Sequence, residues 1–163
     1  MRAIPAGLLL LTAAAAGSCG DSMIDAARAE RVIRGAVAEQ LRSRVADVAC
    51  PTDVRKEPDG RLTCIVTGVD GSKGAAVVTQ RENGGFFVAA PFLNVREAEG
   101  VMAEQIGRQI KRDDVRVFCP EIVIDRKGRR FACRARAGGR SADFTVRLTD
   151  GAGHFTYRPP TLR

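Results

Sequence analysis

The stretch Val48-Ala49-Cys50-Pro51, with Cys64 after thirteen intervening residues, returns 69 residues later as Val117-Phe118-Cys119-Pro120 with Cys133. It lies inside a longer repeat, because fifteen residue pairs between positions 25 and 160 are identical at this offset without a gap. Average residue usage predicts only about four or five such matches over this length. The sequence is therefore interpreted as two copies of one module.

The first eighteen residues predict a signal peptide of the lipoprotein type. A basic start at Met1-Arg2 precedes an apolar run from Leu8 to Ala16, which is too short to predict a membrane span. The run ends in Ala16-Gly17-Ser18-Cys19, so we expect Cys19 to be acylated and residues 19–24 to form an anchor or linker. The alternative is ordinary cleavage within Ala14-Ala15-Ala16, which would leave Cys19 as an unmodified thiol and the protein as a secreted one.

The cysteine count agrees with that prediction. Five cysteines are an awkward number for an exported protein, and assigning Cys19 to lipid leaves four. Three pairings are possible, and we favour Cys50 with Cys64 and Cys119 with Cys133 because each module must have closed its own bond before duplication. A zinc site is the competing interpretation, but structural zinc requires more closely spaced pairs and an exported protein meets an oxidising compartment.

Hydrophobic periodicity predicts a helix at the start of each copy. The first covers residues 25–44, and Asn94 with Glu97 is expected to cap the second. After each Cys-Pro the period becomes two. We expect a strand at 122–124, a turn at 126–128 and a strand at 131–136 that buries alternate residues, with 62, 64 and 66 buried in the first copy.

Further strands are predicted at residues 75–79 and 86–89, and at 144–148 and 155–157, separated by glycine-rich turns. The expected fold class is α+β, with two tandem repeats that each comprise a helix, a four-stranded antiparallel meander and one disulfide. The repeats occupy residues 25–91 and 92–160, and residues 161–163 form a tail. We expect each disulfide to join the second strand to the exit of the helix, which compensates for the small core of one repeat.

The pattern Val-x-Cys-Pro, followed by a cysteine on a strand, resembles domain of unknown function 4333, a family of small exported or lipid-anchored actinobacterial domains. Val48, Cys50, Pro51 and Cys64 match its pattern, as do their counterparts in the second copy. The resemblance implies a location outside the cytoplasm and no known activity. The arrangement also resembles, in topology alone, the β-lactamase-inhibitory protein architecture, a likeness that transfers no contact residues.

Charge distinguishes the two copies. Residues 20–91 contain ten basic and ten acidic residues, whereas residues 92–163 contain fifteen basic and nine acidic ones. The candidate cations for an anionic partner crowd one predicted hairpin: Arg126, Lys127, Arg129, Arg130, Arg134 and Arg136. Anionic lipid, a wall polymer or an acidic envelope protein would suit them, and a merely solvated sheet face is the alternative. Nucleic acid is not expected, since no aromatic residues are interleaved for base stacking.

The sequence predicts neither a catalytic nor a metal site, and no cofactor. His154 is the sole histidine and has no evident partner, while Asp113-Asp114 is interpreted as a solvated turn. We therefore expect a non-enzymatic, lipid-anchored module on the outer face of the cell membrane that binds or builds the envelope. A protein inhibitor or regulator of a secreted or envelope enzyme is the alternative, and a small enzyme with a site shared by both copies is a weaker third. The oligomeric state is left open.

Overall fold

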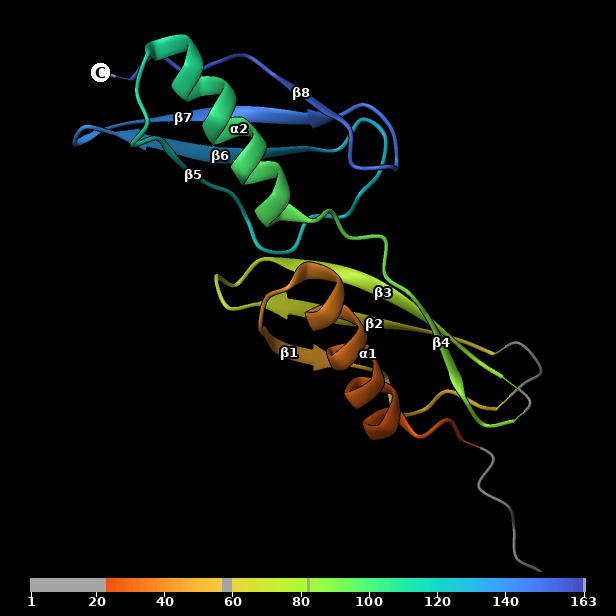
Figure 1. Cartoon of the computed structure of the whole chain (residues 1–163). Helices are drawn as coiled ribbons and strands as arrows, with labels where there is room; N and C mark the ends of the chain where they lie inside the picture. Colours follow the sequence, from red (N-terminus) through yellow and green to blue (C-terminus); the bar gives the residue numbers. More distant parts are fainter. Residues whose placement is uncertain (1–22, 57–59, 82, 163) are drawn as a thin grey trace, which may run out of the picture.

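The computed structural model describes residues 23–56, 60–81 and 83–162, so Cys19 and the predicted signal peptide lie outside the described residues. The first module contains α1 (Ala26–Leu41), β1 (Val45–Ala49), β2 (Arg61–Gly68), β3 (Lys73–Gln80) and β4 (Phe86–Ala89). The second contains α2 (Val95–Ile110), β5 (Arg116–Phe118), β6 (Arg130–Ala137), β7 (Arg140–Leu148) and β8 (Phe155–Tyr157). Each set of strands forms its own antiparallel meander, and each helix covers one face of its sheet (Figure 1). The α+β class is confirmed.

Both helices begin at a polar cap. The side chain of Asp25 accepts a hydrogen bond from the Arg28 backbone N–H at 2.9 Å, and Asn94 accepts one from Glu97 at 3.3 Å, which confirms the predicted cap. Each helix ends one residue before a left-handed residue, Arg42 or Lys111, and these two lie 69 positions apart. The first helix is therefore shorter than the predicted 25–44.

The first strand of each sheet was predicted in the wrong place. It precedes Cys-Pro rather than following it, so that β1 and β5 lead directly into Cys50 and Cys119. The predicted strand at 122–124 is instead a connection whose residues alternate between two cores. Ile122 packs in the first core and Val123 in the second, while an isolated bridge joins Ile124 to Phe92. Burial on both sides explains why this apolar run resembles a strand.

Each disulfide joins two neighbouring strands rather than a strand and the helix exit. The last pairs of the register, Ala49 with Ile65 and Phe118 with Arg134, are directly adjacent to the bonded cysteines. Cys50 and Cys119 follow the first strand directly, and their Cα atoms lie 4.4 and 4.3 Å from those of Cys64 and Cys133. The predicted pairing is confirmed. The predicted link to the helix is made by a glutamate, since the Cys50 N–H donates to the Glu30 carboxylate at 3.0 Å.

The second module repeats this contact, where the Cys119 N–H donates to Glu99 at 2.7 Å. Glu30 and Glu99 are identical at the offset of 69, and the contact gives that identity a structural reason. The glutamate holds the backbone of the first cysteine against the helix in both modules.

The gap-free alignment fails in the third strand of each sheet. Arg61 pairs with Thr79, so a constant offset of 69 would pair its counterpart Arg130 with Leu148. Arg130 pairs instead with Arg147, one residue earlier in the chain. The β2–β3 turn encloses Val69-Asp70-Gly71, while β6 and β7 are joined by Gly138-Gly139 alone, both with positive φ as a tight hairpin requires. The β7–β8 loop is in turn one residue longer than the β3–β4 loop, which restores the offset.

The longer β2–β3 turn contacts the second module. Asp70 accepts a hydrogen bond from the Glu121 N–H at 3.0 Å, Glu121 accepts one from Val69 at 2.8 Å, and the Ser72 hydroxyl accepts one from Ile122 at 2.8 Å. Beneath these bonds Phe92 and Ile122 complete the core of the first module. The modules are stacked end to end, and the described chain begins on the side of the first module that is remote from the second (Figure 1).

Candidate functional site

The outer face of the sheet β5–β8, on the side away from α2, gathers the cations that the sequence singled out. Strand β6 alternates strictly, so Phe131, Cys133 and Ala135 are buried in the core while Arg130, Ala132, Arg134 and Arg136 are exposed. We call this surface the cationic face, and it also carries Arg116 and Phe118 of β5 and Asp143, Thr145 and Arg147 of β7. Three of the six predicted cations, Arg130, Arg134 and Arg136, therefore lie on one sheet face.

Two pairs of arginines lie directly opposite each other on neighbouring strands. Arg116 of β5 is the cross-strand partner of Arg136, and Arg147 of β7 is the partner of Arg130. Like charges in opposite positions destabilise a sheet, so neither pair serves the stability of the fold. Arg116 and Arg147 were missed by the sequence analysis, because only the strand register shows which residues face each other.

Arg134 lies between these pairs but is already neutralised. Its guanidinium donates two hydrogen bonds to Asp143, from Nε at 2.6 Å and from Nη2 at 2.9 Å. The hydrogen bonds from Arg134 hold the pKa of Asp143 below its usual value. Arg134, one of the candidate cations, is therefore paired with Asp143, and the middle of the face carries no net charge.

One end of the cationic face is hollowed. Arg116, Phe118, Arg136 and Arg140 line a hollow of about 640 Å³ beside the Gly138-Gly139 turn. The Arg136 guanidinium lies over the Phe118 ring, 5.2 Å from its centroid. Stacking on Phe118 orients this guanidinium and leaves its edge available to a ligand.

Asp114 supports the turn at this hollowed end. It accepts hydrogen bonds from the Gly138 N–H at 2.8 Å and from Arg112 at 2.7 and 2.8 Å. These bonds hold the pKa of Asp114 far below its usual range, and the hydrogen bonding from Arg112 contributes most. Asp114 is exposed in a turn, as the sequence suggested, and is in addition the ion-pair partner of Arg112.

The other end of the face continues into the predicted hairpin tip. Arg126, Lys127 and Arg129 are exposed around Gly128, which has a φ of 81°. The Gly128 N–H donates to the Leu148 carbonyl at 2.8 Å, and the Leu148 N–H donates to Arg129 at 2.9 Å. The tip is thereby fixed to the end of β7, next to Arg130 and Arg147.

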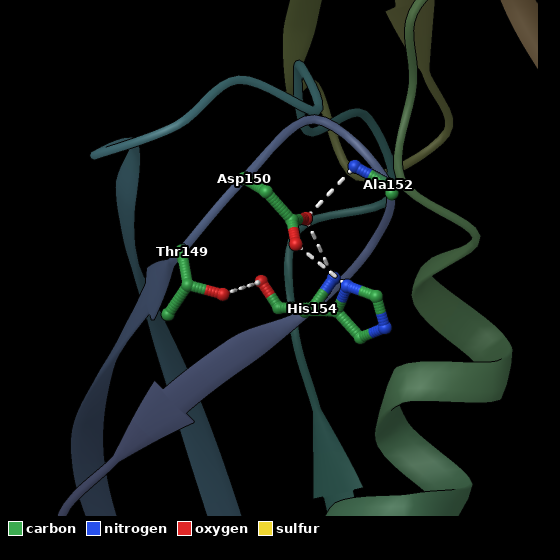
Figure 2. A network of polar contacts seen from close by, with 4 residues as sticks. All are labelled: Thr149, Asp150, Ala152 and His154. Carbon is green, nitrogen blue, oxygen red and sulfur yellow. Dashed lines mark hydrogen bonds and ion pairs between the residues drawn. The ribbon is translucent and has the colours of Figure 1, made fainter.

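A second cluster of polar residues lies in the β7–β8 loop. Asp150 accepts hydrogen bonds from the Ala152 N–H at 2.9 Å and the His154 N–H at 3.3 Å, and its other oxygen lies 2.6 Å from the His154 ring (Figure 2). The Ala152 bond is the main reason that the pKa of Asp150 is lowered. His154 therefore has a partner that the sequence analysis missed, although Asp150 lies only four positions before it in the chain.

The loop borders a cleft of about 530 Å³ against α2, lined by Leu93, Val101 and Phe155 together with Glu97 and Asp125. Burial raises the pKa of Asp125, whose Oδ1 is buried and has no hydrogen-bond partner among the described residues. Over the described ranges, no three histidine, cysteine, aspartate or glutamate side chains are grouped to hold a metal ion. The cleft thus combines a His–Asp pair and a carboxylate with an apolar floor.

Comparison with known proteins found no matching family model, no matching curated protein and no matching solved structure. The resemblance to domain of unknown function 4333 stays a prediction. Within the part of the chain that the structure describes, neither helix is long and apolar enough to cross a membrane.

Proposed function

We propose that this chain is a non-enzymatic, lipid-anchored module of the cell envelope that binds an anionic partner through the cationic face. The observation that carries the proposal is the pair of directly opposed arginines at each end of β6, Arg116 with Arg136 and Arg130 with Arg147. Two disulfides support an oxidising, exported location. The lipid anchor at Cys19 rests on the sequence pattern alone.

The first module supports this proposal by contrast. The counterparts of Arg116 and Arg136 are Asp47 and Thr67, and the counterparts of Arg130 and Arg147 are Arg61 and Thr79. The same sheet therefore forms without opposed arginines, so the fold does not require them. Guanidinium groups bind carboxylate and phosphate oxygens through paired hydrogen bonds, which makes an anionic ligand the partner that would offset the repulsion.

The hairpin tip gives the most direct test. The test variant replaces four cations by Glu: Arg126, Lys127, Arg129 and Arg130. We expect it to lower the affinity of the mature protein for an anionic wall-polymer preparation, and we expect the binding that remains to depend less on salt concentration. These side chains are exposed, so the variant should keep its thermal unfolding midpoint.

The matched control reverses four exposed cations of the first module, Arg55, Lys56, Arg61 and Lys73, and changes the net charge equally. If both variants lose binding to the same extent, the partner responds to net charge and the proposal fails. Mass spectrometry of the mature protein tests the anchor separately, since an unmodified Cys19 would refute it.

A second function is favoured by the first sheet. Its outer face exposes Ile65 and Phe87 with 43% and 52% of their surface accessible, beside Ala49 and Val77. Such an apolar sheet face suits a protein partner, as in an inhibitor or regulator that docks on a secreted or envelope enzyme. Crosslinking in intact cells from position 63, which lies on the same face opposite Val77, should then capture one discrete protein. Loss of that product with Ile65→Glu would identify this face as the contact.

A further inference from the structure

The two opposed arginine pairs lie at opposite ends of one strand. Arg130 and Arg136 are six positions apart on β6, which corresponds to about 20 Å along an antiparallel strand. Arg147 and Arg116 flank them on the neighbouring strands. The cationic face thus presents two separate double charges on one side of the same sheet.

The surface between the two pairs is neutral and shallowly hollowed. The Arg134–Asp143 ion pair and Ala132 occupy it. A hollow of about 480 Å³ runs over these residues and shares Phe118 and Arg136 with the larger hollow at the end of the sheet. Asp70 of the β2–β3 turn and Asp143 also line this hollow, but Asp70 accepts a hydrogen bond from the Glu121 N–H and Asp143 is paired with Arg134. A ligand that lies along β6 therefore passes only carboxylates that already have hydrogen-bond donors.

We propose that the cationic face binds a linear polyanion that lies along β6 and bridges the two arginine pairs. This inference rests on the proposed function and names the class of partner. The ligand groups are oxyanions, either phosphodiesters or carboxylates, because both match the paired donors of a guanidinium. Two anionic groups on one chain would bind jointly, so affinity would exceed that of either group alone.

The geometry favours a polymer over the anchoring membrane. Met23 is four positions after Cys19, so an acyl group on Cys19 would hold the start of the first module within about 14 Å of the bilayer surface. The cationic face belongs to the second module, on the far side of the first (Figure 1). Among described residues, Phe118 is the one large exposed hydrophobic side chain on this face, and the Arg136 guanidinium lies over its ring. A single such side chain gives little apolar area for insertion into a bilayer.

The test compares chain lengths. Binding of the mature protein, held in uncharged detergent, is measured by calorimetry against tripolyphosphate and long-chain polyphosphate at equal phosphate concentration. Poly-L-glutamate and glutamate form the carboxylate arm. The membrane arm uses the Cys19→Ser protein, which carries no acyl group and needs no detergent, with vesicles of anionic lipid. We expect the long chains to bind at least tenfold more tightly than the short ones, and the better arm assigns the oxyanion.

Two variants remove one end each, Arg116→Gln with Arg136→Gln and Arg130→Gln with Arg147→Gln. Either is expected to reduce long-chain affinity about tenfold, to the short-chain level, while binding of tripolyphosphate changes at most twofold to threefold. The control, Arg61→Gln with Lys73→Gln, removes two exposed cations from the first sheet and should leave the length dependence intact. Unchanged thermal midpoints establish that all three variants are folded.

The outcomes separate this inference from the proposed function. Equal affinity for long and short chains, with both sensitive to the arginine variants, would overturn the bridging polymer but keep the anionic partner. Tighter binding to vesicles than to either polymer would overturn it in favour of a membrane surface. No anion binding at all, or equal loss in the first-sheet control, would overturn both proposals.

Discussion

The two modules share a framework and differ on the surfaces that it presents. Both have the helix cap, the left-handed helix end, the glutamate that holds the cysteine backbone and the disulfide between the first two strands. On the outer sheet face, however, Asp47, Thr67 and Thr79 correspond to Arg116, Arg136 and Arg147. The buried contacts therefore define the module, and the exposed positions were free to acquire a different partner.

The turns also differ between the two modules, although the strands that they connect correspond to each other. The extra residue in the β2–β3 turn of the first module brings Asp70 to the second module, and the extra residue in the β7–β8 loop accommodates the Asp150–His154 contact. A one-residue change in a hairpin loop alters the register without altering the meander. Each module has thus used a lengthened turn for a contact that the other module lacks.

The largest expected effect tests whether the modules share a core. Phe92 belongs to the second module by sequence but packs, 3% exposed, in the core of the first. Phe92→Ala should lower the free energy of unfolding by about 3–5 kcal/mol. Relative to the wild-type protein, the variant should show a larger acceleration of amide hydrogen exchange in β2 and β3 than in β6 and β7. Equal acceleration in both sheets would show that the modules unfold as one unit.

The disulfides give the next effect. Replacing Cys50 and Cys64 by Ala, or Cys119 and Cys133 by Ala, should each cost about 3 kcal/mol because each bond closes a loop of the same length. Urea denaturation measures both losses. We expect them to agree within about 1 kcal/mol. A much larger loss for the second pair would show that the first module depends on the second for its stability beyond Phe92 and Ile122.

A smaller effect is expected at the contact between the modules. A Cβ at Gly74 would lie 2.6 Å from the Phe92 ring and 2.8 Å from Ile122, so Gly74→Ala should cost about 1–3 kcal/mol in thermal or urea unfolding. Gly35→Ala is the matched control. It adds the same methyl group inside α1, where no atom beyond the neighbouring residues and the helix's own backbone lies within 4 Å, and should stabilise the protein by about 0.5–1 kcal/mol. Loss of stability in both variants would exclude the contact as the cause.

Much of the framework could be predicted from the sequence because it depends on local pattern. The alternation of Phe131, Cys133 and Ala135 places β6, and the repeat predicts the disulfide pairs. The first strands were missed because three to five residues carry too little periodicity, and residues 122–124 misled because two cores bury opposite sides of them.

For the site, sequence placed the exposed tip correctly but could not find Arg116 or Arg147. Their role depends on which residue faces which across strands, and the register changes by one residue between the modules. The Arg134–Asp143 pair was hidden for the same reason, since nine positions separate the two residues along the chain. Register is a property of the folded sheet, so loop lengths had to be known first.

The smallest expected effect is a difference in pH dependence between Glu99 and Glu30, the two glutamates that accept a hydrogen bond from a cysteine N–H. Glu99 is half-buried at the junction of the modules, and burial together with the nearby Glu121 raises its pKa above the usual 4.5. Since the folded state then binds the proton more tightly than the unfolded state, stability should fall as pH rises from about 4.5 through the folded pKa. Arg96 and the Cys119 N–H oppose this effect without cancelling it.

Glu99→Gln keeps a hydrogen-bond acceptor for Cys119 and removes the charge. We expect it to change the free energy of unfolding by at most about 1 kcal/mol and to make the decline above pH 4.5 shallower, measured by urea unfolding between pH 4 and 8. The raised pKa of Asp125 contributes the part of the decline that remains. Glu30→Gln is the counterpart in the first module, where position 52 is the uncharged Thr52 instead of Glu121. If the two variants flatten the pH profile equally, the shared contact with cysteine and not the junction between modules determines the ionisation of Glu99.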